Sequence, residues 1–569
     1  MKFRSAWIIS ILAAIVAAAF SLWGQATIDK DAVWAAMQAE LQRSMTLSLK
    51  QLERPYFVAY SIDDGKTWSA SATLGGLTSA NAGKFRRPSV QVRVGDYKFD
   101  NTNGGGGRGR GGASYELSGF PLDDDPLVIR QYLWLETDSA YKGAVQSIAQ
   151  KRAAQGSVNQ TEQLPDFAAA QPFTLLEDRP LIAFDDRTWS ERTRRVSAVF
   201  GQFPNIRDSV VAYSAIDGVH RFINSEGTRI RQVQSEGSVQ IRAAVQAPDG
   251  MMLRDSAVIY RLDLTKMPSE DELTKQARGV AEQLTKLAAA PMGDAYSGPI
   301  LFEGVASAQL MAEVLGRNLH INRSGVGGRG GAGGRGGRGG PAGRGGGGAA
   351  TELEGRRGVR IMPDMFNVVD DPTLPLFGHT EVDDEGVPSK PVSLVEKGVL
   401  KDFLRTRLPV QGFSESNGRA LLGNSPAPTN LVVSTSEKSP VADLRKNMID
   451  LCRQRGLAYG VIVRKLDFPS AGGGGGGQIS APLYIYRLYL DGHEEMIRGV
   501  RLRSVNARSL KDILLAGDDA ATLDYVEGGS ADVTVVAPSV LIDDLELEKV
   551  GDTLPKLPFA PPPVVAQAR

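Results

Sequence analysis

The sequence predicts an α+β fold in two domains, a mixed helix-and-strand N-terminal domain followed by a C-terminal domain rich in antiparallel sheet. A chain of 569 residues exceeds one compact hydrophobic core, so at least two domains are expected. Helix and strand patterns are mixed before residue 290, and short strand patterns dominate after residue 296. The turn-forming stretch PMGDAYSGP at 291–299 separates the two patterns. We therefore expect domains at 27–290 and 296–553.

The first 26 residues have the pattern of a secretory signal peptide. Lys2 and Arg4 precede an apolar run at 6–23, and the small residues of 24–26 offer a cleavage site. An uncleaved N-terminal anchor is the alternative, because the run approaches the ~20 residues that span a bilayer. Both interpretations place the bulk of the chain outside the cytoplasm, so we expect an exported, periplasmic or extracellular protein.

The N-terminal domain is predicted from local helix and turn signals. Apolar residues recur every four positions at 33–45, which predicts a helix that Pro55 ends. The turn residues within INSEGTRI at 223–230 predict a hairpin between two β-rich segments. Ser269 and Glu272 form an S-x-x-E capping box for a helix that runs to about residue 290. The other expected elements are strands at 56–62 and 88–94 and a helix at 139–154.

The C-terminal domain is predicted from short apolar strands with few helices between them. Helices are expected at 305–316 and 440–455, with a short one at 509–515. Ser439 and Pro440 supply the cap and first turn of the second helix, and Gly456 ends it. The single cysteine, Cys452, adjoins the apolar stripe of that helix, and we interpret it as a buried structural thiol. The strands are expected in PVSLVEKG, NLVVSTS, YGVIVRKL, PLYIYRLYL and ADVTVVAPSVLI.

Three glycine-rich tracts interrupt these patterns, at 104–112, 324–348 and 472–477. The longest carries arginines in RGG-like spacing, a composition also found in segments that bind single-stranded nucleic acid. No aromatic residue is interleaved for base stacking, and the 65 Lys and Arg residues balance the 65 Asp and Glu residues, so no overall field favours nucleic acid. We interpret the tracts as solvated loops, with Arg-Gly nucleic-acid binding as an alternative. The tail at 554–569 is expected to be disordered.

A set of distributed motifs runs through the chain in a fixed order. The longest segment is VVDDPTLPLFGHTEVDDEGVPSKPVSLVEKGVLKDFL at 368–404, where D-D-P, D-D-E-G and E-x-G-V-L follow one another. Shorter segments are INSEGTRI, SNGRA at 416–420, MIRGVRL at 496–502 and PSVLIDDLELEK at 538–549. In their order these segments resemble the TldD/PmbA family, described as modulators of DNA gyrase and as U62-type metallopeptidases. The resemblance covers most of residues 30–550.

The segment LMAEVLGRNLH at 310–320 falls where, by this resemblance, TldD-type members carry H-E-x-x-x-H. In that motif two histidines hold Zn²⁺, and the glutamate takes a proton from the metal-bound water. Here Ala312 and Arg317 occupy the two histidine positions, and only Glu313 is kept. Alanine offers no ligand and arginine is always protonated, so we expect no metal site and no zinc cofactor.

The spacing of the two lost ligands constrains the helix itself. Side chains five positions apart on an ideal α-helix point roughly 140° away from each other. The helix must therefore loosen or end between Ala312 and Arg317, and Gly316 lies where this would happen. Two roles remain for Glu313: a vestigial general base in a cleft, or an ion pair with Arg317 on the helix surface worth about 0.3–0.5 kcal/mol.

The sequence offers few replacement ligands for zinc. The third ligand that the resemblance implies is a cysteine of the C-terminal region, where this chain has the 472–477 tract and Gln478. No two histidines have ligand spacing on one local element, so a rebuilt site needs convergence of distant segments. The four histidines are His220, His320, His379 and His493.

The resemblance implies a function in peptide degradation, in which a metal-bearing subunit pairs with a metal-free one around a shared cavity. We hypothesise that this chain is an exported, TldE-like non-catalytic partner or a stand-alone peptide-binding relative, in a hetero- or homodimer with a TldD/PmbA-type subunit. A strand-rich domain can hold unfolded peptides at a sheet edge without a metal. An active metallopeptidase with ligands recruited from elsewhere is the alternative, so whether the chain is an enzyme stays open at this point.

Overall fold

The computed structural model describes residues 31–47, 52–103, 119–155, 164–178, 182, 184–323, 351–423, 425–468 and 479–550. The predicted signal peptide, the three glycine tracts, Gln478 and the predicted tail lie outside these residues. None of the described helices is long and apolar enough to cross a membrane.

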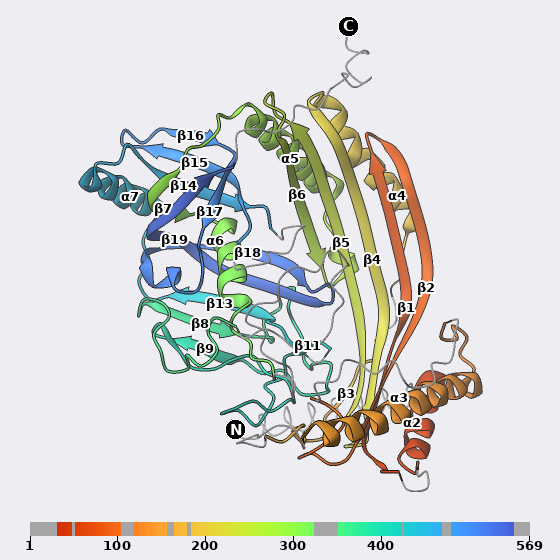
Figure 1. The fold of residues 1–569 in the computed structure, drawn as a ribbon. Coiled ribbons are helices and arrows are strands. Elements are labelled where there is room, and N and C mark those ends of the chain that lie inside the picture. Colours follow the sequence, from red (N-terminus) through yellow and green to blue (C-terminus); the bar gives the residue numbers. More distant parts are fainter. Residues whose placement is uncertain are drawn as a thin grey trace, which may run out of the picture.

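A six-stranded sheet forms the N-terminal part of the structure (Figure 1). The strand order is β2-β1-β4-β5-β3, and β6 also pairs with β5. The strands are β1 (Pro55–Thr73), β2 (Gly76–Val94), β3 (Thr174–Leu176), β4 (Ile206–Asn224), β5 (Arg229–Gln246) and β6 (Met252–Arg261). The predicted hairpin is confirmed as β4–β5. The strands expected at 56–62 and 88–94 are confirmed but extend further, because their distal halves carry small polar residues that give no apolar alternation.

Four helices accompany this sheet in the described residues: α2 (Ala32–Ser44), α3 (Pro126–Gln155), α4 (Asp186–Ser197) and α5 (Glu270–Ala289). The capping box of α5 is confirmed, since Ser269 and Glu272 hydrogen-bond each other's backbone N–H. The α3 helix is longer than the predicted helix at 139–154. The α4 helix was missed because its sequence is strongly polar, with Trp189 and Val196 as its main apolar residues. In Figure 1, α2 and α3 lie at the β3 end of the sheet, and α4 and α5 lie toward the other end.

An eleven-stranded sheet forms the C-terminal part. The order β10-β9-β8-β13-β19-β7-β14-β15-β16 forms its main path, and β17 and β18 pair with β19. Most pairs are antiparallel, as predicted, whereas β13/β19 and β7/β14 are parallel. The strands are β7 (Tyr296–Phe302), β8 (Phe366–Asp370), β9 (Val392–Glu396), β10 (Val399–Leu400), β13 (Asn430–Thr435), β14 (Tyr459–Leu466), β15 (Pro482–Tyr489), β16 (Glu494–Ile497), β17 (Val500–Arg503), β18 (Ile513–Glu527) and β19 (Ala531–Lys549), beside a separate two-stranded ribbon of β11 (Ala420–Leu422) and β12 (Ser425–Pro426).

The α7 helix (Val441–Arg455) differs from the prediction in its N-cap and agrees with it in its end and in the burial of its cysteine. Its N-cap is Pro440 without a side-chain cap, rather than Ser439, because the backbone of Ser439 pairs with the β18 segment by donating to the Ala516 carbonyl at 3.0 Å. Gly456 ends the helix in the left-handed conformation, with φ of 68°. Cys452 is a free and fully buried thiol, as predicted. The short helix expected at 509–515 is a 3₁₀ turn at Ser509–Asp512.

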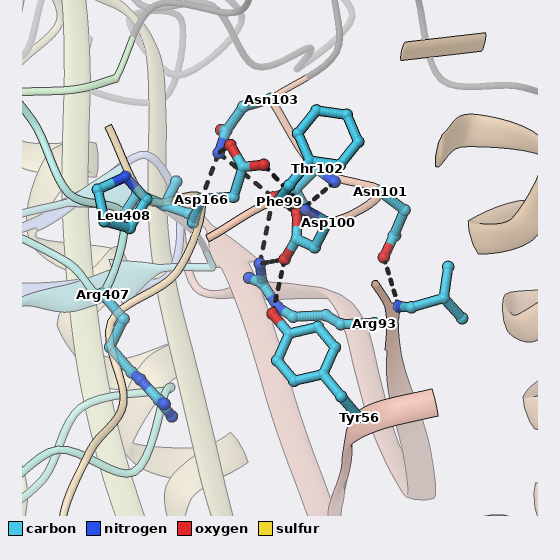
Figure 2. A network of polar contacts seen from close by, with 12 residues as sticks. Tyr56, Arg93, Phe99, Asp100, Asn101, Thr102, Asn103, Asp166, Arg407 and Leu408 are labelled. Carbon is cyan, nitrogen blue, oxygen red and sulfur yellow. Dashed lines mark hydrogen bonds and ion pairs between the residues drawn. The ribbon is translucent and has the colours of Figure 1, made fainter. Parts of the chain in front are cut away.

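A buried ionic network ties the N-terminal part together (Figure 2). Through Arg323 it also reaches the C-terminal part. Arg93 Nη1 and Tyr56 OH both donate to Asp100 Oδ2 at 2.8 Å, and neither Arg93 nor Asp100 is exposed. Asp166 Oδ2 accepts from the backbone N–H of Asp100 at 2.9 Å. Arg323, which follows helix α6 (Val305–Met311) in the C-terminal part, pairs with Asp166 Oδ1 at 3.0 Å. Burial of charges is tolerated here because each is paired.

A cluster of three carboxylates also bridges the two sheets. Glu236 lies on β5, Asp524 on β18 and Asp532 on β19. Burial, followed by the charges of Glu236 and Asp524, raises the pKa of Asp532 to about 8. Like charges this close disfavour ionisation, so the folded protein favours a protonated Asp532 at neutral pH.

Replacing this carboxyl with an amide tests the cluster. A folded-state pKa raised above the ordinary 3.8 gives stability at low pH that is lost as pH rises from about 4 to about 8. Asp532→Asn should therefore match wild type at pH 4 and be more stable by roughly 2–5 kcal/mol at pH 8. Urea unfolding across this range measures the difference, with the exposed Asp518→Asn as control. If the difference in unfolding free energy between wild type and Asp532→Asn does not grow with pH, the pKa of Asp532 is not raised in the folded protein.

Candidate functional site

The short helix α6 (Val305–Met311) continues into a π turn at Ala312–Gly316. The backbone N–H of Arg317 donates to the carbonyl of Ala312 at 3.3 Å, five residues back rather than four. The predicted loosening between these two positions is therefore confirmed. Because a five-residue hydrogen bond closes this turn, positions 312 and 317 lie on one side of the helix. The turn thus brings positions 312 and 317 closer in direction than an ideal α-helix would.

Polar contacts hold α6 rigidly against the C-terminal sheet. Ser307 Oγ donates to the Pro538 carbonyl at 2.6 Å. Gln309 pairs with the backbone of Leu466, accepting from its N–H at 2.7 Å and donating to its carbonyl at 3.3 Å. The helix is almost fully buried, and its apolar side chains belong to the main core of the C-terminal part. The orientation of the π turn is thus set by β14 and β19, the strands that carry Leu466 and Pro538.

Glu313 is a buried carboxylate with a full set of close partners. Its Oε2 accepts from the backbone N–H of Ser480 at 2.6 Å, and its Oε1 accepts from the Ser480 hydroxyl at 2.7 Å. The ion pair with Arg317 that the spacing predicts is present, at 3.7 Å. Its expected place on the helix surface is wrong, because Glu313 is only 5% exposed. Ser480 was missed by sequence reasoning, since it lies 167 positions away and no local pattern marks it.

The surroundings of this carboxylate are apolar and acidic. Tyr525 on β18 is buried, and Phe468 packs edge-on against its ring at 5.1 Å between centroids. Burial raises the pKa of Glu527, the charge of Arg317 opposes that rise, and the charge of Glu313 adds to it. The Arg317 side chain is 39% exposed and is therefore accessible from solvent. The site thus pairs a partly exposed guanidinium with a buried carboxylate.

These residues do not fit a zinc ion. Ala312 has no donor atom, and Arg317 brings a positive charge to the second ligand position. Both carboxylate oxygens of Glu313 already accept short hydrogen bonds from Ser480. Within the described ranges, no group of three His, Cys, Asp or Glu side chains is arranged to hold a metal ion.

Each of the four histidines has its own local environment. His220 on β4 faces Asp63 on β1, with 2.5 Å between Nδ1 and Oδ1. His320 follows the π turn, and burial lowers its pKa below the ordinary value. The Nδ1 atom of His379 contacts the Pro372 carbonyl at 2.9 Å, and that of His493 contacts the Asp491 carboxylate at 2.7 Å.

The D-D-E-G motif that resembles the family has a structural place in this chain. Asp383 Oδ1 accepts from the backbone N–H groups of Glu385 at 3.0 Å and Val387 at 2.9 Å, which closes the loop. Gly386 has φ of +78°, and a Cβ there would lie 2.7 Å from the ring of Phe222 on β4. Burial raises the pKa of Asp384 to about 6, and the charge of His220 opposes this rise. The motif therefore fixes the contact between the two parts of the chain.

Comparison with known proteins points to one family. Residues 349–549 match the model of the PmbA/TldA metallopeptidase C-terminal domain. A metalloprotease from Archaeoglobus fulgidus is 47% identical over 58 residues, or 10% of this chain and 14% of the relative. One from Methanothermobacter thermautotrophicus is 23% identical over 333 residues, or 57% of this chain and 62% of the relative. The chain thus spans less than two thirds of either curated relative.

Solved structures share the fold over most of the chain. The structure of TldE from Thermococcus kodakarensis aligns with a TM-score of 0.57 at 13% identity, covering 90% of this chain and 100% of that one. A candidate modulator of DNA gyrase from Thermotoga maritima aligns with a TM-score of 0.54 at 15% identity, covering 86% of this chain and 96% of that one. At these identities the likeness concerns the fold alone.

The burial of Glu313 predicts a stability effect that a surface ion pair does not. Glu313→Gln keeps the shape but removes the charge from two hydrogen bonds, and it should destabilise the protein by about 1.5–3 kcal/mol. Arg317→Gln, the matched change on the exposed partner, should lower stability by at most about 1 kcal/mol. Urea unfolding of both variants measures this. Equal and small effects would show that Glu313 is solvated in solution.

Proposed function

We propose that this chain, which belongs to the TldD/PmbA family, is a metal-free subunit that binds unfolded peptides and does not hydrolyse them on its own. The observation that carries the proposal is the π turn at Ala312–Gly316, which keeps the frame of the zinc helix while Ala312 and Arg317 occupy the ligand positions. A widened helix turn without metal-binding side chains favours a role in binding peptides over a role in cleaving them.

Glu313 supports the same conclusion. A general base must be free to take a proton from water. Here the carboxylate is 5% exposed and accepts from both the N–H and the hydroxyl of Ser480. Each of its two oxygens already accepts one of these hydrogen bonds. Glu313 therefore acts in our account as an anchor that joins the π turn to the segment before β15.

Arg317 supplies the binding chemistry that the site still has. Its guanidinium pairs with Glu313 at 3.7 Å and remains partly exposed. A guanidinium presents several donors in a fixed fork, which suits a peptide carbonyl or a C-terminal carboxylate. In this proposal the peptide binds beside Arg317 at the end of the π turn. Arg317 and the edge of a sheet hold it there.

The partner in this proposal is a TldD/PmbA-type subunit with an intact H-E-x-x-x-H, in a dimer that encloses the peptide. The likeness of the fold to TldE from Thermococcus kodakarensis supports this assignment. We also propose export, because the charged and apolar pattern of residues 1–26 is typical of a signal peptide. The mature subunit and its partner would then meet outside the cytoplasm.

A mixing assay tests the proposal. The purified chain alone should not cleave an unfolded peptide such as reduced, alkylated casein fragments. Addition of a relative with an intact H-E-x-x-x-H should give chelator-sensitive cleavage above that of the relative alone. Glu313→Gln in this chain should not abolish cleavage by the mixture, because the base resides in the other subunit. Chelator-sensitive cleavage by the chain alone, lost in Glu313→Gln, would instead establish a metallopeptidase with recruited ligands.

A further inference from the structure

A recess unrelated to the π turn lies on the N-terminal sheet, between α4 and the β1–β2 hairpin. Its cavity volume is about 70 Å³, and it opens to solvent on one side. Its walls come from β1, β2, β4, α4 and the segment before α4. The residues that line it are Trp68, Ser69, Ala70, Ala80, Asn81, Ala82, Phe184, Asp186, Trp189, Ser190 and Tyr213.

One wall of the recess is a continuous column of aromatic rings. Trp189 stacks on Tyr213 with 4.2 Å between ring centroids and 13° between planes. Phe184 stacks on Tyr213 at 5.4 Å and 10°, and Trp68 lies 4.6 Å from Phe184. Trp68, Phe184 and Trp189 are only partly buried, so parts of their surfaces face the recess. Such a wall favours a flat ring by stacking.

Small side chains on the hairpin keep the recess empty. Ala80 and Ala82 lie on β2 opposite Ala70 and Trp68 of β1, and both β2 residues are exposed. The hairpin cannot close over the gap, because its tip is tied to the end of α4. There the N–H of Gly75 donates to Ser197 Oγ at 3.0 Å. The width of the recess is therefore fixed by the fold.

The recess has polar groups beside its aromatic wall, among them Ser69, Asn81 and Ser190, and the Tyr213 hydroxyl is the buried one. Tyr213 is 2% exposed, and its OH has no hydrogen-bond partner among the described residues. Unpartnered buried polar atoms are uncommon in folded proteins. Burial raises the pKa of Tyr213 above its ordinary value, so the hydroxyl remains a donor. An acceptor that enters the recess would satisfy it.

We propose that this recess binds a planar, single-ring aromatic group that carries a hydrogen-bond acceptor, stacked against the aromatic column and bonded to Tyr213. The site is separate from the Glu313 region and does not depend on the function proposed above. The same chemistry is found in a free phenol-like molecule and in a tyrosine side chain of an extended polypeptide. The polypeptide has a route to the site, because β2 pairs only with β1 among the described strands and residues 76–84 of it are exposed.

Titration by ligand-observed NMR tests the site, with phenol, fluorobenzene and the capped peptide Thr-Val-Tyr-Val-Thr as probes. Three variants accompany the wild type. Ala80→Leu fills the recess from an exposed position, and Ser79→Leu is its matched control, because residue 79 does not line the recess. Tyr213→Phe removes only the hydroxyl. Thermal unfolding checks that every variant is folded.

The proposal predicts saturable phenol binding to wild type and Ser79→Leu that is lost in Ala80→Leu. Tyr213→Phe should weaken phenol binding by about five- to tenfold and leave fluorobenzene binding unchanged, since fluorobenzene is a poor acceptor. Peptide affinity more than tenfold above that of phenol would identify a polypeptide as the source of the ring, and equal affinity a free small molecule. Absence of saturable binding by phenol and peptide, or binding that neither Ala80→Leu nor Tyr213→Phe changes, would overturn the proposal. If Ala80→Leu does not fold, the contrast between phenol and fluorobenzene in Tyr213→Phe decides alone.

Discussion

The hydrogen bond from the Arg317 N–H to the Ala312 carbonyl is the constraint on which the arrangement of the candidate site depends. It widens one turn of an otherwise ordinary helix and turns two positions five residues apart toward the same side. A widened turn gives up regular α-helical hydrogen bonding, so it needs support from its surroundings. That support comes from Gln309, which is bonded to the backbone of β14, and from Glu313, which is bonded to Ser480. The fold thus supports a widened turn with Ala312 and Arg317 at its two ends.

Two contacts join the N-terminal and C-terminal parts of the chain, one ionic and one apolar. Arg323 leaves the end of the π-turn segment and pairs with Asp166, which belongs to the network around Arg93 and Asp100. The D-D-E-G loop brings a second contact, where Gly386 packs on Phe222. Paired buried charges set a unique arrangement at the expense of desolvation, and breaking one pair costs more than a surface pair would. These two contacts join the N-terminal and C-terminal parts of the chain.

The sequence predicted those elements that depend on interactions between neighbouring residues. The capping box of α5, the β4–β5 hairpin and the helix end at Gly456 all follow from residues within a few positions of each other. The loosened turn before Arg317 was expected instead from the family resemblance, which places two ligand positions five residues apart. The α4 helix and the distal halves of β1 and β2 were not predicted, because their polar and small residues give no periodic apolar signal. The burial of Glu313 could not be predicted either, since it depends on Ser480, whose approach is a tertiary event.

Zinc titration of wild type and of the double variant Ala312→His with Arg317→His tests most directly whether the frame of a metal site persists without its ligands. The structure predicts that wild type binds far less than one zinc ion per chain. The double variant should acquire zinc affinity measurable by calorimetry, because the π turn already presents both positions on one side. Stoichiometric zinc in the wild-type protein, or a folded double variant without any gain in affinity, would contradict the account.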